Sequence, residues 1–199
     1  MAGDDQTLNF YDGEAAKYAP WSAPETPYPW LEKFLSLTPP NGQLLDFGCG
    51  GGWAAARMVE VGRRVDAIDG SAELVAEARK LFGIKAKVGR FETLDAVHLY
   101  DGIWAHFSLL HSAKADMPAH LDRIFTALKP SGQLYIGLKA GEGEKRDSLG
   151  RFYAYYEEAE LKDHLTNAGF SNIDMRSRTG EAYDGGTENL WHAFACRPD

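Results

Sequence analysis

The chain has 199 residues, the usual length of one domain, and 44% of them are hydrophobic while 25% are charged. These proportions are typical of a globular protein and exclude a mainly disordered chain. The formal net charge of −8 disfavours a broad surface that binds nucleic acid or anionic lipid. We therefore expect neither a nucleic-acid partner nor a membrane partner.

Cysteine use and the distribution of apolar residues bear on the compartment. The two cysteines, Cys49 and Cys196, are too few for a disulfide framework, which favours a reducing environment. Residues 1–6 lack the basic and apolar regions of a targeting sequence, and no apolar run approaches the roughly 18 residues that span a bilayer. We expect a cytoplasmic protein, and neither cysteine is expected to ligate a metal.

Short runs typical of β-strands alternate with helical stretches from Leu44 onward. This alternation is typical of βαβ units on a mostly parallel sheet. Strands are expected at residues 43–47, 64–69, 85–88, 100–105 and 133–138, and a final hairpin at residues 173–177 and 190–196. Helices are expected at residues 53–61, 72–82, 116–128 and 158–168. The pattern predicts an α/β protein.

Aromatic residues and prolines are concentrated before the first expected strand, in residues 7–40. Two interpretations are open, a helical layer packed across one end of the sheet and a lid over a binding site. Tyr11 and Tyr18 are seven residues apart, which places both rings on one face of a helix. Core packing and a binding role explain that spacing equally well.

A glycine-rich loop, Asp46-Phe47-Gly48-Cys49-Gly50-Gly51-Gly52, follows the first expected strand and precedes a helix. Ligands of α/β sheets bind at this edge, and the free N–H groups of a helix start suit an anionic group. Asp69 ends the second expected strand, 21 residues after Gly48, a separation at which a carboxylate can bind ribose hydroxyls. Together the two features predict a nucleotide-type binding site.

Three segments carry a resemblance to a known family. Leu44–Gly52 resembles the glycine motif of class I S-adenosylmethionine-dependent methyltransferases, Tyr100–Ala105 resembles their fourth strand, and Leu128–Leu134 resembles the "LKPGG.L" approach to their fifth. The resemblance runs from about Tyr11 to the C-terminus. It implies a Rossmann-like, doubly wound sheet of seven strands, mostly parallel, whose last strand is antiparallel. It also implies one domain over residues 1–199, with a helical cap at 1–40 and a cofactor-binding core at 41–199.

The resemblance implies S-adenosylmethionine as the cofactor and assigns residues to it. The methionine part is expected at the loop, the ribose at Asp69 and the adenine at Phe91, while Arg90 stands where the family commonly has an acidic residue. The expected cofactor-binding residues are Asp46, Gly48, Cys49, Gly50, Asp69, Gly70, Phe91, Ala105 and His106, together with Tyr11 and Tyr18 from the N-terminal segment.

Methyl transfer is an in-line displacement, so alignment of the two reactants supplies much of the catalysis and no metal is required. A base is useful only where the acceptor must lose a proton. His106 and His111 follow the fourth expected strand and are candidates for catalysis, although histidines bonded within a loop explain them too. Beyond the fifth strand, residues 139–146 and 151–156 are interpreted either as a mobile loop or as an acceptor pocket. In that pocket Arg151, Tyr153 and Tyr155 bind substrate.

Two functions other than methyl transfer stay open at this point. Gly50, Gly52 and Ala55 satisfy a relaxed dinucleotide pattern, which allows an NAD-dependent oxidoreductase. In the register that starts at Gly48, however, Trp53 takes the third-glycine position and would hinder helix–strand packing. A non-catalytic protein that binds S-adenosylmethionine is the other alternative. A small-molecule acceptor is favoured because no Asp/Asn-Pro-Pro-Tyr/Phe segment follows the fourth strand.

Overall fold

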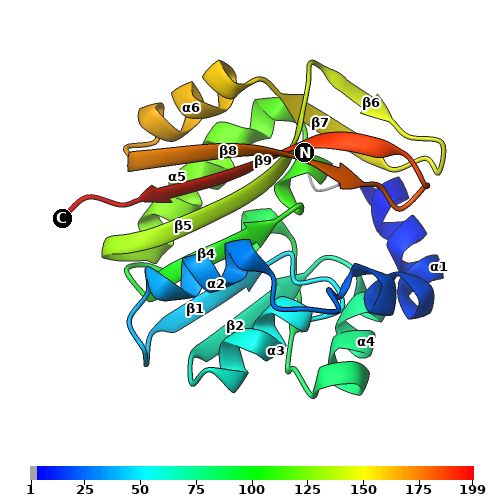
Figure 1. Cartoon of the computed structure of the whole chain (residues 1–199), viewed down its shortest axis with the longest axis horizontal. Helices are drawn as coiled ribbons and strands as arrows, with labels where there is room; N and C mark the ends of the chain where they lie inside the picture. Colours follow the sequence, from blue (N-terminus) through cyan, green and yellow to red (C-terminus); the bar gives the residue numbers. More distant parts are fainter. Residues whose placement is uncertain (1–3) are drawn as a thin grey trace.

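A computed structural model describes residues 4–199, which form a twisted sheet with helices on both faces (Figure 1). The strands are β1 (Gln43–Phe47), β2 (Arg64–Asp69), β3 (Lys87–Val88), β4 (Tyr100–His106), β5 (Leu128–Ala140), β6 (Glu144–Arg146), β7 (Phe152–Tyr156), β8 (Ser171–Glu181) and β9 (Thr187–Cys196). The helices are α1 (Asp5–Ser22), α2 (Pro29–Ser36), α3 (Trp53–Glu60), α4 (Ala72–Phe82), α5 (Met117–Ala127) and α6 (Glu158–Asn167).

The main sheet has the order β3-β2-β1-β4-β5-β9-β8. The first five strands of that order are parallel, and β9 runs antiparallel to both of its neighbours. The predicted seven-stranded, mostly parallel sheet with an antiparallel last strand is thereby confirmed. The strand order reverses between β1 and β4, so a ligand site is expected at their carboxyl ends.

The two faces of the sheet are covered by different helices. Along β1, Leu44 points to the face that packs on α2 and α3, while Leu45 and Phe47 point to the face covered by α5. The alternation follows from the two-residue period of a strand. Helix α4 packs beside α3 over β2, through Val75 and Ala78. Both faces of the central strands are therefore buried, as is usual for parallel strands with helices on both faces of the sheet.

Several expected boundaries differ from the observed ones. Strand β3 has two residues instead of four, and β5 begins at Leu128, where the predicted helix was to end, because Leu128 already pairs with Tyr100. The far end of β5 also extends past β4. There Lys139 and Ala140 pair with β7.

Strands β6 and β7 were not expected, and they correct one interpretation of the segment after β5. Residues 144–146 are exposed, but Phe152–Tyr156 forms a largely buried strand that pairs with β6 and with β5. The mobile-loop interpretation is therefore wrong for residues 152–156. Four of its five residues are aromatic, and this composition, which is favoured in strands, was the sequence signal.

The N-terminal segment forms two helices in different places. Helix α2 packs Leu31 and Phe34 on the sheet, against Trp104 among others. Helix α1 lies beside α4 and beside the tip of the β8–β9 hairpin (Figure 1). The predicted helical cap thus consists of one helix on the sheet face and one helix across the carboxyl ends of the strands.

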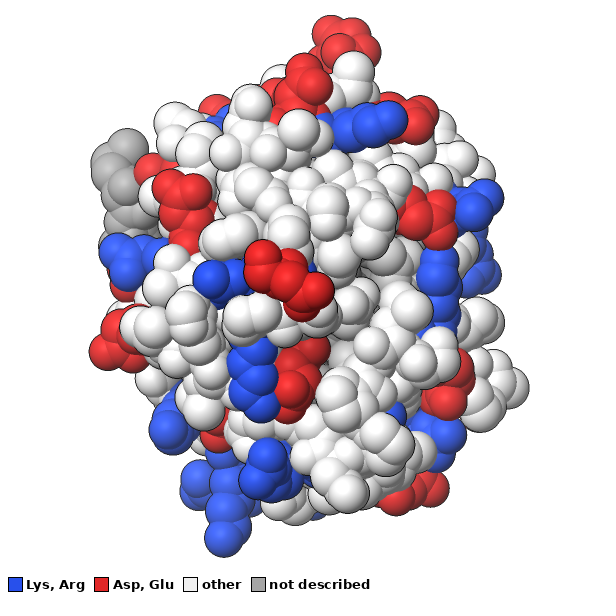
Figure 2. Space-filling model, turned by 90° about the vertical axis from the view of Figure 1, so that its left-hand side faces the viewer, with Lys and Arg blue, Asp and Glu red and all other residues white. Residues whose placement is uncertain are grey.

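The surface carries charges of both signs. Figure 2 shows acidic and basic side chains interspersed over one face, with the basic ones denser along its lower left edge. Within residues 4–199 no helix combines the length and the apolar character needed to cross a membrane.

Candidate active site

A cavity of about 360 Å³ opens at the carboxyl ends of β1, β2 and β4. Its walls come from the glycine loop, from the segments that follow β2, β3 and β4, from α1 and from the C-terminal hairpin. Of the eleven residues predicted to bind the cofactor, ten line this cavity: Tyr11, Tyr18, Asp46, Gly48, Cys49, Gly50, Asp69, Gly70, Phe91 and His106. The eleventh, Ala105, is completely buried in β4 behind it.

The glycine loop needs glycine for two different reasons. Gly50 has φ +52°, and a Cβ at this position would meet no atom within 4 Å, so the backbone faces open space. Gly51 instead lies against α1, where a Cβ would come within 2.6 Å of the Cβ of Ala19. The loop therefore exposes its backbone on one side and accepts a closely packed helix on the other.

Two carboxylates fix the shape of this loop. Asp69 accepts a hydrogen bond from the Gly50 N–H (2.8 Å) and another from the Ser71 N–H (2.8 Å). Asp46 accepts one from the Ala55 N–H (3.0 Å), in the first turn of α3. Burial raises the pKa of both carboxyl groups, that of Asp46 to about 7, and the negative charge of Asp69 raises the pKa of Asp46 further.

The opposite end of the cavity is bounded by the segments after β2 and β3. Gly70 lies under α1, since a Cβ there would meet Leu8 at 2.7 Å. Phe91 packs edge-to-face on Phe47, with ring centroids 5.1 Å apart, and presents an aromatic wall. Arg90, in the position where the family commonly has an acidic residue, is paired with Asp5 of α1.

Helix α1 covers the cavity with one face. Tyr11 and Tyr18 both line the cavity, and their ring centroids are 4.9 Å apart in an edge-to-face arrangement. The seven-residue spacing did predict a shared face. Between them, Asp12 accepts hydrogen bonds from the Ser71 hydroxyl (2.6 Å) and the Glu73 N–H (3.2 Å), which ties α1 to the start of α4.

His111 is held by two hydrogen bonds. Its Nδ1 donates to the Phe152 carbonyl (2.7 Å), so in the neutral ring Nε2 is an acceptor, and it accepts the hydrogen bond that the Tyr11 hydroxyl donates (2.9 Å). Burial lowers the pKa of His111 to about 4. The ring lines the cavity, but the lone pair of Nε2 already accepts the hydrogen bond from Tyr11 of α1. This nitrogen is therefore not free to act as a base.

His106 has a freer position. Its Nδ1 is bonded to the Tyr135 hydroxyl (3.0 Å), and its ring meets those of Tyr28 and Trp53 edge-to-face at the cavity wall. Burial lowers the pKa of His106 to about 3, and the neighbouring His192 contributes to this shift.

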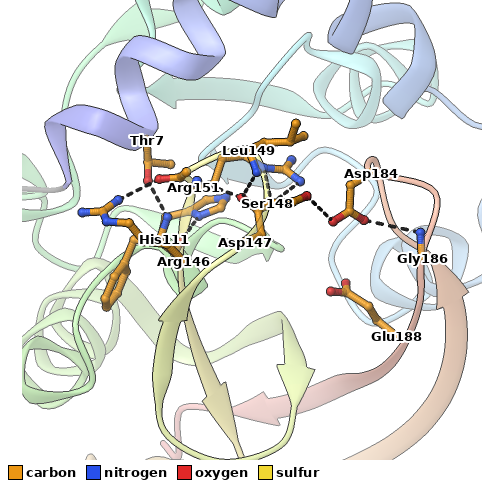
Figure 3. A network of polar contacts seen from close by, with 12 residues as sticks. Thr7, His111, Arg146, Asp147, Ser148, Leu149, Arg151, Asp184, Gly186 and Glu188 are labelled. Carbon is orange, nitrogen blue, oxygen red and sulfur yellow. Dashed lines mark hydrogen bonds and ion pairs between the residues drawn. The ribbon is translucent and has the colours of Figure 1, made fainter.

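The residues predicted to bind substrate lie outside the cavity lining. Arg151 is 2% exposed, forms an ion pair with Asp147 (2.7 Å), and stacks its guanidinium near the rings of Phe10 and Tyr183. Figure 3 shows it inside a polar network that joins α1, the β6–β7 hairpin and the turn of the β8–β9 hairpin. Tyr153 is buried beneath the Lys139 ammonium group, and Tyr155 is half-buried on the same strand. Arg151 packs on a ring of α1 and Tyr153 packs on the His111 ring, so these two side chains support the wall near α1.

Sequence reasoning missed a second group of residues in the cavity. They are mostly aromatic and come from α2, α3, the end of β4 and the C-terminal hairpin: Tyr28, Trp53, Trp104, Phe107, Arg178, Leu190 and His192. The aromatic density of residues 7–40 was a signal for Tyr28. No sequence signal marked His192, because the hairpin was interpreted only as the edge of the sheet.

Comparisons with known proteins agree with this fold. Residues 44–132, which include the glycine loop and Asp69, match the sequence model of a methyltransferase domain. This match covers less than half of the chain, and together with the fold of the solved structures it confirms the resemblance to class I S-adenosylmethionine-dependent methyltransferases. No curated protein matches the chain in sequence.

Solved structures with the same fold have low sequence identity. The Burkholderia thailandensis 1,6-didemethyltoxoflavin-N1-methyltransferase, solved with 1,6-didemethyltoxoflavin and S-adenosylhomocysteine, is 22% identical with a TM-score of 0.78, over 98% of this chain and 88% of that one. A methyltransferase from Methanosarcina mazei is 20% identical with a TM-score of 0.75, over 86% and 98%. A Haemonchus contortus phosphoethanolamine N-methyltransferase is 16% identical with a TM-score of 0.74, over 97% of this chain and 60% of that one.

Proposed function

We propose that this protein is an enzyme that transfers a methyl group from S-adenosylmethionine to a small-molecule acceptor. One observation carries the proposal: the matched segment brings Gly50 and Asp69 into hydrogen-bond contact on the wall of one cavity, with the loop backbone open toward the cavity.

The residues present fit this cofactor. The backbone at Gly50 faces free space and suits a carboxylate and an ammonium group, because no side chain blocks their approach there, whereas Gly48 lies against the Ser108 side chain. Asp69 has acceptor capacity left for ribose hydroxyls, since a carboxylate offers about four lone-pair sites and two are used. The ring of Phe91 provides a face for the adenine. When bound, S-adenosylmethionine supplies an electrophilic methyl group on a sulfonium sulfur.

Helix α1 acts as the cover of this site. Ala19 and Leu8 pack directly on Gly51 and Gly70, and the rings of Tyr11 and Tyr18 close the cavity from the same side. A cover of this kind excludes water and strengthens electrostatic interactions inside the site. In this proposal residues 1–40 and 41–199 are one functional domain, in which Arg151 and Tyr153 hold the cover rather than touch the acceptor.

The acceptor is small in this proposal because the cavity is bounded on several sides and has a volume near that of ordinary ligand pockets, about 300–1,000 Å³. The Burkholderia relative was solved with a small compound beside S-adenosylhomocysteine, which supports the same class. The formal net charge of −8 favours this class over a nucleic-acid acceptor, whose phosphate backbone is negatively charged.

Isothermal calorimetry tests the proposal. S-adenosylmethionine and S-adenosylhomocysteine should both bind, whereas NAD should give no heat at the same concentration. If NAD binds and neither sulfur compound does, the methyltransferase proposal is wrong and an NAD-dependent oxidoreductase is favoured.

A further inference from the structure

The cavity has an aromatic end that the cofactor assignment does not use. The ring centroid of His106 lies 5.0 Å from that of Tyr28, 5.6 Å from that of Trp53 and 4.4 Å from that of Phe107. All four residues line the cavity. Aromatic walls favour flat partners, which stack on them or meet them edge-on. The shape and chemistry of this end suit a planar aromatic molecule.

A chain of hydrogen bonds lies behind His106. The Tyr135 hydroxyl is 3.0 Å from Nδ1 of His106 and 2.7 Å from Nδ1 of His192. Tyr135 and His192 are completely buried. A hydroxyl has one hydrogen to donate, so at least one of the two histidines must donate its own Nδ1–H to the phenol oxygen.

The single hydrogen of the Tyr135 hydroxyl decides the tautomer of His106. The Tyr135 hydroxyl contacts Nδ1 of His192 at 2.7 Å and also the side chain of Tyr28. If its hydrogen goes to either of these, His106 donates its own Nδ1–H to the phenol oxygen across the 3.0 Å contact. Burial keeps both rings neutral by lowering their pKa values to about 3 and about 4. Nε2 of His106 is then unprotonated.

From this geometry we infer that the acceptor is a planar aromatic or heteroaromatic molecule with a dissociable N–H or O–H, and that Nε2 of His106 receives its proton. Tyr135 and His192 are positioning residues, because they fix the direction of the His106 ring and its tautomer; Tyr135 does not line the cavity, and His192 borders it with its side chain completely buried. The inference rests on the proposed methyltransferase function.

The step balances in atoms and electrons. The acceptor nitrogen or oxygen forms a bond to the methyl carbon, and the carbon–sulfur bond breaks with its electron pair moving to sulfur. The proton lost by the methylated acceptor goes to Nε2 of His106. A weak base is adequate because methylation makes that proton strongly acidic before it leaves.

Paired ligands test the acceptor class in protein saturated with S-adenosylhomocysteine. The probes are umbelliferone with its methyl ether herniarin, and xanthine with its methylated form caffeine, measured by fluorescence or calorimetric titration. The unmethylated member of at least one pair should bind about tenfold more tightly, since it keeps the hydrogen bond to His106. If neither unmethylated compound binds better than its partner while S-adenosylhomocysteine still binds, the inference is overturned and the methyltransferase proposal stands. If S-adenosylhomocysteine itself does not bind, both fail.

The positioning residues are tested by the tautomer of His106. Long-range proton–nitrogen NMR of histidine-labelled wild-type protein should show Nδ1 of His106 protonated and Nε2 bare at neutral pH. Tyr135→Phe should abolish the preference for this His106 tautomer. Tyr100→Phe is the matched control, because it also removes a hydroxyl, but that hydroxyl bonds Asp66 outside the cavity; it should leave the tautomer unchanged. A protonated Nε2 in the wild-type protein would overturn the inference even if every variant unfolded.

His192 offers a rescue experiment. His192→Asn keeps a polar atom near the position of Nδ1, whereas His192→Leu removes it. We expect the asparagine variant to retain the His106 tautomer and the preference for umbelliferone, and the leucine variant to lose both, with S-adenosylhomocysteine affinity unchanged in each. Equal behaviour of the two variants contradicts a positioning role.

Discussion

Replacing Asp69 by alanine should weaken cofactor binding while leaving the fold intact. The carboxylate lies at the end of β2 on the cavity wall, and it holds the Gly50 and Ser71 N–H groups at 2.8 Å each. The substitution removes the acceptor for the ribose and also frees the loop backbone. Both effects lower affinity for S-adenosylhomocysteine.

The magnitude follows from the kind of bond that is lost. A hydrogen bond to a charged group contributes about 1.5–3 kcal/mol, which corresponds to a dissociation constant about 10- to 150-fold higher. Asp69→Asn keeps one oxygen acceptor and should fall between the wild type and Asp69→Ala. Calorimetric titration with S-adenosylhomocysteine measures both variants.

Asp66 provides the matched control for this experiment. It lies three residues earlier on β2, bonds Gln43 and Tyr100 instead of the loop, and does not line the cavity. Asp66→Ala should change affinity by no more than about twofold. Folded Asp69→Ala with unchanged affinity would refute the ribose assignment, and equal losses in both variants would indicate general destabilisation.

Three further predictions concern the cover and the buried carboxylate. A chain that begins at Pro24 lacks α1 and should keep the sheet, by circular dichroism, but bind S-adenosylhomocysteine at least about tenfold more weakly, because the walls from Tyr11 and Tyr18 are gone; full affinity would contradict a cover. Tyr11→Phe should lower the free energy of unfolding by about 0.5–1.5 kcal/mol through loss of the bond to His111, and a smaller loss than in Tyr18→Phe would argue against that bond. The pKa of Asp46 is raised to about 7 in the fold from 3.8, so its contribution to stability is present at low pH and is lost as pH rises through 7. The free energy of unfolding of Asp46→Asn, measured in urea, should therefore rise by about 2–4 kcal/mol relative to that of the wild type as pH increases from about 4 to about 8. A difference between the two proteins that does not change with pH would contradict the raised pKa.

The cofactor half of the site could be predicted from the sequence because it depends on local patterns. A strand, a glycine loop and a helix are adjacent in the chain, and parallel pairing of β1 with β2 brings Asp69 to the same edge. For that reason Gly48, Gly50 and Asp69 line one cavity as expected.

The aromatic half depends on pairings between distant segments. His192 reaches the cavity only because β9 inserts beside β5 in a register that opposes it to Gly137. A shift of one residue would turn its side chain to the other face of the sheet. Such a register cannot be derived from strand propensity, and the residue was therefore missed.

Arg151 illustrates the reverse case. An arginine followed by three tyrosines within five residues was interpreted as a recognition site, but alternation along β7 and packing against α1 bury the guanidinium beside Asp147. The ion-pair partner Asp147 is close in the sequence, whereas the rings of Phe10 and Tyr11 that cover the guanidinium come from a helix more than a hundred residues away.

A crystal structure of the protein grown with S-adenosylhomocysteine tests the central claim most directly. The account predicts the ribose hydroxyls within hydrogen-bond distance of the Asp69 carboxylate, the amino-acid part along Gly48 to Gly50, and the sulfur directed toward the aromatic end that holds His106. A ligand bound anywhere else, or a cavity that stays free of ligand at millimolar concentration while calorimetry gives no heat, would contradict it.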